Sequence, residues 1–393
     1  MFLLVMCVIC TLFGIVMIYS MTKNYGWAKY VVVQAFAMCL GIGAFVVLTV
    51  IDPDLIAANW KPLTIFNVVF ILGLLVFGKG DEVGSRAWYR FFGIGVQPSE
   101  IVKVIFIVLM AKQMSKYKEQ NRLNRFPNLM KLAIHFVLYF GLITVIPNDL
   151  GSALIFLAIF IVMLVCAGVT WYWMGLAAAA VAAFIPLAWN FILKDYQKNR
   201  ILAPYIPDVV DPSGQGITWQ TNLCKDALAS GRWTGVGFGE GSFSQSSYNA
   251  RHTDCIFASI GEELGMIAGI IIIILLTIII IRCCVIGMRS GSNFGMLICF
   301  GVATALAFQT FINIGMCIGI TPVIGITLPF FSYGGSSIVA MYAAVGLVSG
   351  IKYRPKPKQN FVQYPGVVED VEHPAARRPR TGRRPHVRTK KQA

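Results

Sequence analysis

Long apolar runs alternate with short polar segments along most of the chain. A run of about twenty apolar residues is long enough to cross a bilayer as a helix. By this measure the sequence predicts ten spans, at residues 2–20, 29–50, 60–78, 99–115, 130–147, 151–168, 172–193, 256–281, 293–319 and 329–351. The longest polar segment, residues 194–255, separates the seventh span from the eighth. The predicted fold class is an all-α polytopic membrane protein with about ten transmembrane helices.

Composition supports this prediction. Hydrophobic residues make up 57% of the 393 residues and charged residues 13%, whereas soluble domains carry about 25% charged residues. The ten cysteines show neither a disulfide framework nor zinc-site spacing. The first apolar run lacks a basic flank and a convincing cleavage site, so we expect a retained span rather than a signal peptide.

The distribution of Lys and Arg predicts the orientation. Basic residues gather at 116–131, at 282–289 and beyond residue 352, which places both termini in the cytoplasm. The 194–255 segment is then an extracytoplasmic loop, and its own basic residues call for an anionic partner there. Residues 1–352 form the predicted transmembrane domain. Residues 353–393, rich in Pro and Arg, are predicted to be a disordered cytoplasmic tail held near anionic headgroups.

One short polar stretch, residues 251–265, stands immediately before a very apolar run. It contains Arg251, His252 and Asp254, followed by Glu262 and Glu263. Ionisable groups so near hydrocarbon are costly and favour a functional hypothesis. The competing interpretation is that Asp254 caps the helix that follows, and the spacing alone does not separate the two.

Other polar positions in the spans also carry two interpretations. Glu100 and Lys103 share a helix face and are predicted to form a structural ion pair. Asp149 is expected to cap a helix or to hold a cation with Asp254. The glycine run from Gly235 to Gly241 is either a phosphate cradle or a flexible loop.

Three further segments complete the polar pattern. Residues 217–229 are predicted to form a short surface helix, and residues 79–98 a loop that re-enters the membrane or lies on its surface. Gln309 and Asn313 share a helix face and could bond across helices or line a cavity. The Pro- and Gly-rich break at 321–337 lies at membrane depth, where irregular backbone needs protein or a wet cavity around it.

These motifs, in this order, resemble the SEDS family (shape, elongation, division and sporulation), which contains RodA, FtsW and SpoVE. The resemblance covers about residues 10–351. The motifs that carry it are Gln97-Pro98-Ser99-Glu100 with Lys103, Pro147 to Leu154, Arg200, Asp211-Pro212, Trp219-Gln220, His252-Thr253-Asp254 through Gly265, Asn313 to Met316, and Leu328 to Ser337.

The resemblance implies a peptidoglycan glycosyltransferase that polymerises lipid II at the outer face of the cytoplasmic membrane, for cell elongation, division or sporulation. It also implies a class B penicillin-binding protein as partner and a divalent cation, Mg²⁺ or Mn²⁺, as cofactor. The family's essential aspartate falls on Asp254. The chain departs from the family pattern at Cys255, Asn249-Ala250, Leu223-Cys224 and Ala87. Met316 favours the RodA subgroup and Thr327 another, so the subgroup stays open.

The reaction implied by the resemblance needs a base and positive charge for the departing pyrophosphate. Asp254 is the candidate catalytic base, with metal coordination as its rival role. Arg200, Arg251 and Arg86 are the candidates for the pyrophosphate, because the Arg fork matches phosphate oxygens. His252 and Gln220 are further candidates for substrate contact. Asp149, Asp254 and Glu262 are the candidate metal ligands.

Two other classes of function fit the same pattern. A lipid II flippase or other transporter would also carry broken helices and intramembrane charges. A transporter should show inverted repeats, and no convincing repeat of the Asp254 region is present in the N-terminal half. The third class is a non-enzymatic scaffold for a penicillin-binding protein.

Overall fold

A computed structural model gives the fold and describes residues 1–353 except 25, 79–85, 92–93 and 247. Contacts divide the chain into Met1–Pro357 and Lys358–Ala393. Apart from Tyr353, the tail predicted at residues 353–393 lies outside the described residues. The described helices that include or cross the predicted spans are α1 (Phe2–Thr22), α2 (Trp27–Val50), α4 (Trp60–Leu72), α5 (Leu74–Phe77), α6 (Pro98–Glu119), α7 (Phe126–Val145), α8 (Leu150–Ala167), α9 (Trp171–Leu187), α13 (Ile256–Arg289), α14 (Asn293–Ile318) and α15 (Gly335–Tyr353).

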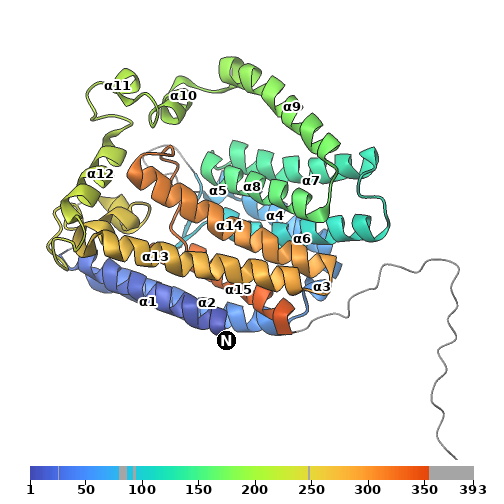
Figure 1. The fold of residues 1–393 in the computed structure, drawn as a ribbon, viewed down its shortest axis with the longest axis horizontal. Coiled ribbons are helices and arrows are strands. Elements are labelled where there is room, and N and C mark those ends of the chain that lie inside the picture. Colours follow the sequence, from blue (N-terminus) through green and yellow to red (C-terminus); the bar gives the residue numbers. More distant parts are fainter. Residues whose placement is uncertain (25, 79–85, 92–93, 247, 354–393) are drawn as a thin grey trace, which may run out of the picture. The chain divides into compact units, whose positions relative to one another are not determined.

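Nine helices in the described part of the chain are long and apolar enough to cross a membrane, so the protein is a multi-pass membrane protein. The fourth predicted span is the exception. It corresponds to α6, which is 22 residues long but carries several charges, and most of its residues are buried within the bundle. A charged helix can occupy membrane depth when protein rather than lipid surrounds it. Figure 1 shows α6 among α4, α8 and α14.

The core is a set of helix pairs that are distant in sequence. The most extensive contacts join α2 to α15, α13 to α14, and α8 to α14 (Figure 1). Small residues permit the close approach of α2 and α15: a Cβ at Gly346 would lie 2.7 Å from the carbonyl oxygen of Phe45. Tyr342 also packs on Gly41 and donates a hydrogen bond to Thr11 of α1. Small residues at helix interfaces are the usual means of tight packing in membranes.

The long polar segment is largely helical and folds onto the bundle. Its elements are α10 (Asp195–Leu202), α11 (Pro207–Val210), α12 (Trp219–Gly231) and η2 (Asn249–His252). The helix predicted at 217–229 is confirmed as α12, which packs on α13 and α14. The remaining short elements are α3 (Pro53–Ala58), the π-helical turn η1 (Ala188–Ile192), β1 (Tyr89–Phe91) and β2 (Ile94–Val96).

Three details differ from the predicted spans. The third span is divided at Gly73 into α4 and α5. The tenth begins at Gly335 rather than at residue 329, because residues 322–328 have no regular secondary structure and residues 329–333 form turns and bends. In the 79–98 loop, β1 and β2 form an antiparallel hairpin in which Tyr89 pairs with Val96. Residues 79–85 and 92–93 of that loop lie outside the described residues.

Candidate functional site

Asp254 lies in a turn whose backbone is fixed from outside. The turn joins η2 to α13, and three successive carbonyl groups accept hydrogen bonds from a later part of the chain. The donors are the backbone N–H of Tyr333 to His252 at 2.9 Å, Oγ of Ser332 to Thr253 at 2.6 Å, and Nδ2 of Asn313 to Asp254 at 2.7 Å. Asn313 thus bonds out of α14 to this turn, while the bond across helices that one interpretation predicted is made by Gln309 to Glu100 of α6. These contacts hold the turn against α14 and the 322–334 segment.

The carboxylate of Asp254 is half-buried and faces the 322–326 segment. Its Oδ2 lies 3.6 Å from the position that a Cβ at Gly325 would occupy, and Gly325 has a φ of +67°. The glycine both permits this backbone conformation and leaves space beside the carboxylate. The N-cap of α13 is Cys255, without a side-chain capping bond, so Asp254 stands one residue before the cap position.

Helix α12 lies beside the turn. Gln220 donates from Nε2 to Sγ of Cys255 at 3.2 Å, next to Asp254 in sequence, and the Trp219 ring meets the Tyr248 ring edge-on at 5.1 Å. Gln220 thus contacts the residue that follows Asp254, and its predicted contact with substrate stays a prediction. Burial raises the pKa of Tyr248, with contributions from neighbouring thiols and Asp254, so this phenol is held protonated near the carboxylate.

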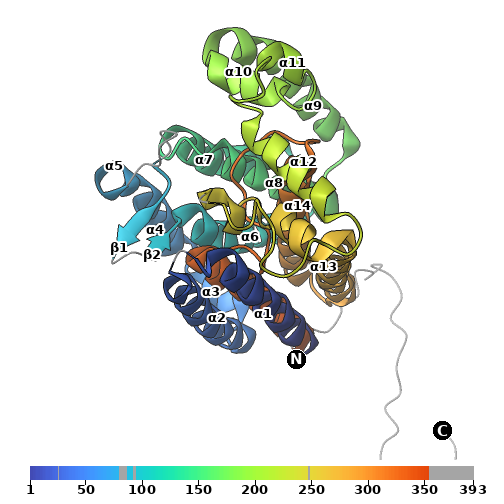
Figure 2. The ribbon, with the colours of Figure 1, turned by 90° about the vertical axis from the view of Figure 1, so that its left-hand side faces the viewer.

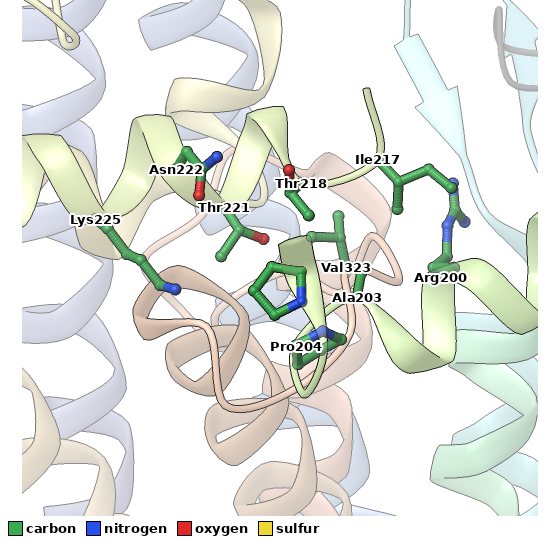
Figure 3. A pocket seen from close by; sticks show the side chains of 10 residues that line it. Arg200, Ala203, Pro204, Ile217, Thr218, Thr221, Asn222, Lys225 and Val323 are labelled. Carbon is green, nitrogen blue, oxygen red and sulfur yellow. The ribbon is translucent and has the colours of Figure 1, made fainter. Parts of the chain in front are cut away.

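A pocket opens on the side of α12 that carries Thr218 and Thr221, and two cations line it. Arg200 of α10 and Lys225 of α12 stand at its two ends in Figure 3, with Val323 between them. Within the described residues neither cation forms an ion pair. Val323 lines the pocket, and Gly325, two residues later, faces the Asp254 carboxylate. The same short segment therefore borders both the pocket and the carboxylate. Arg200 was predicted. Lys225 was missed because it is one of several loop cations in the sequence.

Arg251 and His252 have internal roles in this structure. The Arg251 guanidinium is buried and donates to the carbonyl oxygens of Met21, at 3.2 Å, and Tyr248, at 2.7 Å. His252 is buried with its ring against Tyr30 and Tyr333. Burial, and then the charge of Arg251, lowers the His252 pKa to about 4. These side chains join α1 and α2 to the turn that carries Asp254, and their contacts with the protein give them a structural role.

Arg86 is exposed just before β1. Figure 2 shows the hairpin of β1 and β2 well apart from α10 and α12. The three arginines proposed for the pyrophosphate therefore do not converge: Arg200 lines the pocket, Arg251 is buried in the protein, and Arg86 belongs to another region.

The three predicted metal ligands are not brought together. Within the described residues no group of three His, Cys, Asp or Glu side chains could hold a metal ion. Glu262 is buried and accepts hydrogen bonds from the backbone N–H groups of Phe243 and Ser244, at 3.0 and 2.8 Å, and from the hydroxyls of Ser242 and Ser244. These four hydrogen bonds tie the 242–244 segment to α13 and give the Glu262 carboxylate a structural role.

Asp149 is the N-cap of α8, as one interpretation predicted. Its side chain accepts from the backbone N–H and the hydroxyl of Ser152, at 2.9 and 2.6 Å, and from Nε2 of Gln97 at 2.9 Å. Burial raises its pKa in spite of these bonds. Two residues later, a Cβ at Gly151 would lie 2.6 Å from the carbonyl oxygen of Ile324, so the start of α8 packs closely on the 324–326 segment.

Glu100 and Lys103 form the predicted ion pair, at 2.9 Å, and both are buried. Gln309 and Ser337 each donate to Glu100 at 3.4 Å, which links α6 to α14 and α15. This pair supports the helices beneath the site.

The glycine run is neither a phosphate cradle nor a loose loop. Backbone N–H groups of Val236 and Gly237 donate to the carbonyl oxygens of Glu262 and Glu263 at 2.9 and 3.1 Å. In the other direction, the N–H of Met266 donates to the carbonyl of Arg232 at 2.9 Å. The run therefore packs on α13 near Gly265, where the backbone of that helix departs from helical geometry. The glycines of the run have no side chains, which permits this contact.

The chain is similar to known proteins in both sequence and structure. The model of the FtsW, RodA and SpoVE family, described as "Cell cycle protein", matches residues 1–356. The chain is 32% identical to the peptidoglycan glycosyltransferase MrdB of Escherichia coli K12, over 80% of this chain and 83% of that one. It is also 32% identical to a probable peptidoglycan glycosyltransferase FtsW of Geobacter metallireducens, over 90% of this chain and 94% of that one.

Solved structures show the same fold. A chain from work on the structural coordination of polymerization and crosslinking by a peptidoglycan synthase complex superposes with a TM-score of 0.75 and 25% identity, over 89% of this chain and 96% of that one. RodA of Thermus thermophilus gives a TM-score of 0.66 at 22% identity, over 90% and 96% of the two chains. The family model matches all of the described residues, and the structure holds Asp254 between α14 and the Pro- and Gly-rich segment. The chain therefore belongs to the FtsW, RodA and SpoVE family of membrane proteins.

Proposed function

We propose that this chain polymerises lipid II into glycan strands at the outer face of the cytoplasmic membrane, with Asp254 as the catalytic residue. The enzyme class follows from the family: the chain is a peptidoglycan glycosyltransferase, as its relatives at 32% identity are named. The observation that carries the role of Asp254 is its half-buried carboxylate, on a turn held at three successive carbonyls and beside a pocket with two cations.

The reaction joins the GlcNAc 4-hydroxyl of one lipid-linked disaccharide to C1 of MurNAc on another. The hydroxyl loses its proton to Asp254, the new C–O bond forms at C1, and the C1–O bond to undecaprenyl pyrophosphate breaks. A positioned base contributes roughly 10²–10⁴-fold to such a step. The fixed turn keeps the carboxylate in one place, which is the condition for this contribution.

Arg200 and Lys225 bind the pyrophosphate in this proposal. Both side chains line one pocket, and neither is neutralised by a carboxylate of the described residues. Charge-assisted hydrogen bonds to phosphate oxygens contribute about 1.5–3 kcal/mol each. The two cations would stabilise the charge that develops on the leaving group.

A divalent cation is also proposed, and holding it is the rival role of Asp254, in place of its role as the base. Mg²⁺ usually keeps several waters and binds through one or two carboxylates together with substrate phosphates. A single half-buried carboxylate beside a pocket lined by Arg200 and Lys225 fits this mode. When bound, the cation would neutralise charge on the pyrophosphate.

Glycan synthesis by the purified chain tests the role of Asp254. The chain, with its penicillin-binding protein, lipid II and Mg²⁺ or Mn²⁺, should yield polymer, and Asp254→Ala should yield none. Asp226→Ala, at an exposed position of α12, is the matched control and should keep full activity. Equal polymer from Asp254→Ala would remove this residue from the mechanism. Lipid scrambling without polymer would favour a flippase, and partner activation without either would favour a scaffold.

The pocket is tested by its charges. Arg200→Gln and Lys225→Gln should each lower kcat/KM for lipid II about 10- to 100-fold, the equivalent of one charge-assisted bond. Lys198→Gln is the control, because that lysine pairs with Asp195 at 3.4 Å on α10. Unchanged kinetics in both pocket variants would exclude the pocket as the pyrophosphate site.

The partner in this proposal is a class B penicillin-binding protein, and both termini lie in the cytoplasm. Support for the partner comes from the relative that belongs to a complex of polymerization and crosslinking. Support for the orientation comes from basic residues in the segments at 116–131 and 282–289. Co-purification tests the partner. Labelling of single cysteines placed at positions 213 and 291 tests the orientation, with only the first expected to react from outside.

A further inference from the structure

A second basic pocket lies at the other end of α13 from Asp254. Its cations are Arg282 and Arg289, from the last two turns of α13, and Lys352 at the end of α15. Ile286 and Ile351, both buried, form its floor, and Ser290 lines its wall. Because α13 is 34 residues long, this pocket is far from the proposed catalytic chemistry.

The charges of this pocket are not neutralised by the protein. None of the ion pairs among the described residues includes the three cations, and residues 282–293 contain no acid. Arg282 instead stands 5.8 Å from the ring of Phe2, and Lys352 stands 5.5 Å from that of Tyr353. Three cations held in one concave site without a carboxylate favour an anionic ligand.

The first turn of α14 adds to the same field. A Cβ at Gly295 would lie 3.0 Å from Cγ2 of Ile351, so this glycine brings the positive end of α14 against the pocket floor. The turn contains no acidic residue, and Ser292 caps it through the N–H of Gly295 at 3.0 Å. The pocket thus combines three cations with a helix N-terminus.

The apolar surface beside the pocket selects a lipid over a free anion. Along α13, Ile274, Ile278 and Ile281 are exposed and lead toward Arg282 at the spacing of one helix face. A membrane helix presents such a face to acyl chains. A phosphate in the pocket and an acyl chain on this face would belong to one molecule.

We propose that this pocket binds the phosphate headgroup of an anionic phospholipid, with an acyl chain along the exposed isoleucines of α13. The site is independent of the glycosyltransferase reaction, and its loss would leave Asp254 and its turn unchanged. Bound lipid would join the ends of α13 and α15, which meet at the pocket.

The test compares lipids and variants by the thermal midpoint of the purified full-length chain. Phosphatidylglycerol added to detergent micelles should raise the Tm of the wild type above the value with phosphatidylcholine. Combined Arg282→Gln, Arg289→Gln and Lys352→Gln should weaken this response at least tenfold in lipid concentration. Native mass spectrometry should show the matching loss of bound phosphatidylglycerol.

The matched control removes three cations elsewhere, by Lys116→Gln, Lys118→Gln and Arg122→Gln near the end of α6. It should keep the wild-type response. An equal loss in both triple variants would mean general surface attraction and would overturn the proposal, as would a wild-type response in the pocket variant. Glycerol phosphate giving the same shift at the same concentration would overturn the lipid as ligand. If the triple variant does not fold, Arg289→Gln alone, at an exposed position, should reduce the response.

Discussion

At the scale of single residues, Asn313 has the largest share in placing Asp254. One amide donates to the carbonyl oxygens of Asp254 and Ile326, both at 2.7 Å, and so fixes the turn that carries Asp254 to the segment that faces it. The sequence indicated an amide at the right helix face. It could not indicate the two acceptors, because they lie 59 and 13 residues away.

Asn313→Leu should therefore abolish most polymerisation while the bundle still forms. The variant leaves two carbonyls in the protein without this donor, at about 1–3 kcal/mol each. Glycan synthesis should fall more than tenfold. Thr310→Val is the control, because among the described residues that hydroxyl bonds only to Leu306 within its own helix, at 2.8 Å. Full activity of Asn313→Leu would show that the turn holds its shape without the amide.

His252 predicts a pH dependence of stability. Its pKa is lowered from 6.5 to about 4. Between these two pH values the unfolded chain therefore binds a proton that the folded chain does not. The stabilisation is complete above pH 6.5 and is lost as the pH falls toward 4, by about 3 kcal/mol in all. His252→Phe, which preserves the aromatic packing on Tyr30 and Tyr333, should show a smaller fall in Tm between pH 7.5 and 5. Parallel falls in the two proteins would contradict this role.

At the scale of elements, the break in α13 depends on backbone contacts with the glycine run. The sequence predicts one continuous span there, since Gly265 is followed by an unbroken apolar run. In the structure Gly265 has φ +79° and ψ 179°, and a Cβ there would meet the backbone of Trp233 and Gly235. Apolar periodicity predicts that a helix exists. Its breaks depend on contacts between distant backbones, which periodicity does not contain.

Gly265→Ala should consequently destabilise the protein. The positive φ alone costs about 1–2 kcal/mol for an L-residue, and the contact with Trp233 adds to it. The folded yield and Tm should both fall. Gly43→Ala, where a Cβ meets nothing within 4 Å, should leave both unchanged. A Gly265→Ala protein as stable as the control would mean that the break in α13 is not required.

At the scale of the whole molecule, composition predicts the membrane spans better than it predicts the candidate site, and α6 shows why. Nine described helices are apolar enough to be recognised individually, but α6 crosses among α4, α8, α14 and α15 with Glu100 and Lys103 buried inside the bundle. Glu100 is also one of the motif residues. The sequence places Asp254 at a membrane boundary. The cationic pocket beside it needs α10, α12 and the 322–326 segment to meet, which only the fold provides.

The buried pair on α6 gives the corresponding prediction. Lys103→Met leaves Glu100 buried without its partner and should cost about 3–5 kcal/mol, because an uncompensated charge remains inside the bundle. Glu100→Gln combined with Lys103→Met removes both charges and should recover most of the Tm. Lys112→Met is the comparison, since Lys112 and Asp54 also pair at 2.9 Å but are partly exposed, where such pairs contribute about 0–1 kcal/mol. If the double variant were as unstable as Lys103→Met, the loss would come from packing rather than charge. If the double variant regained its Tm but made no polymer, the pair would also be needed to align α6 and α14 beneath the catalytic turn.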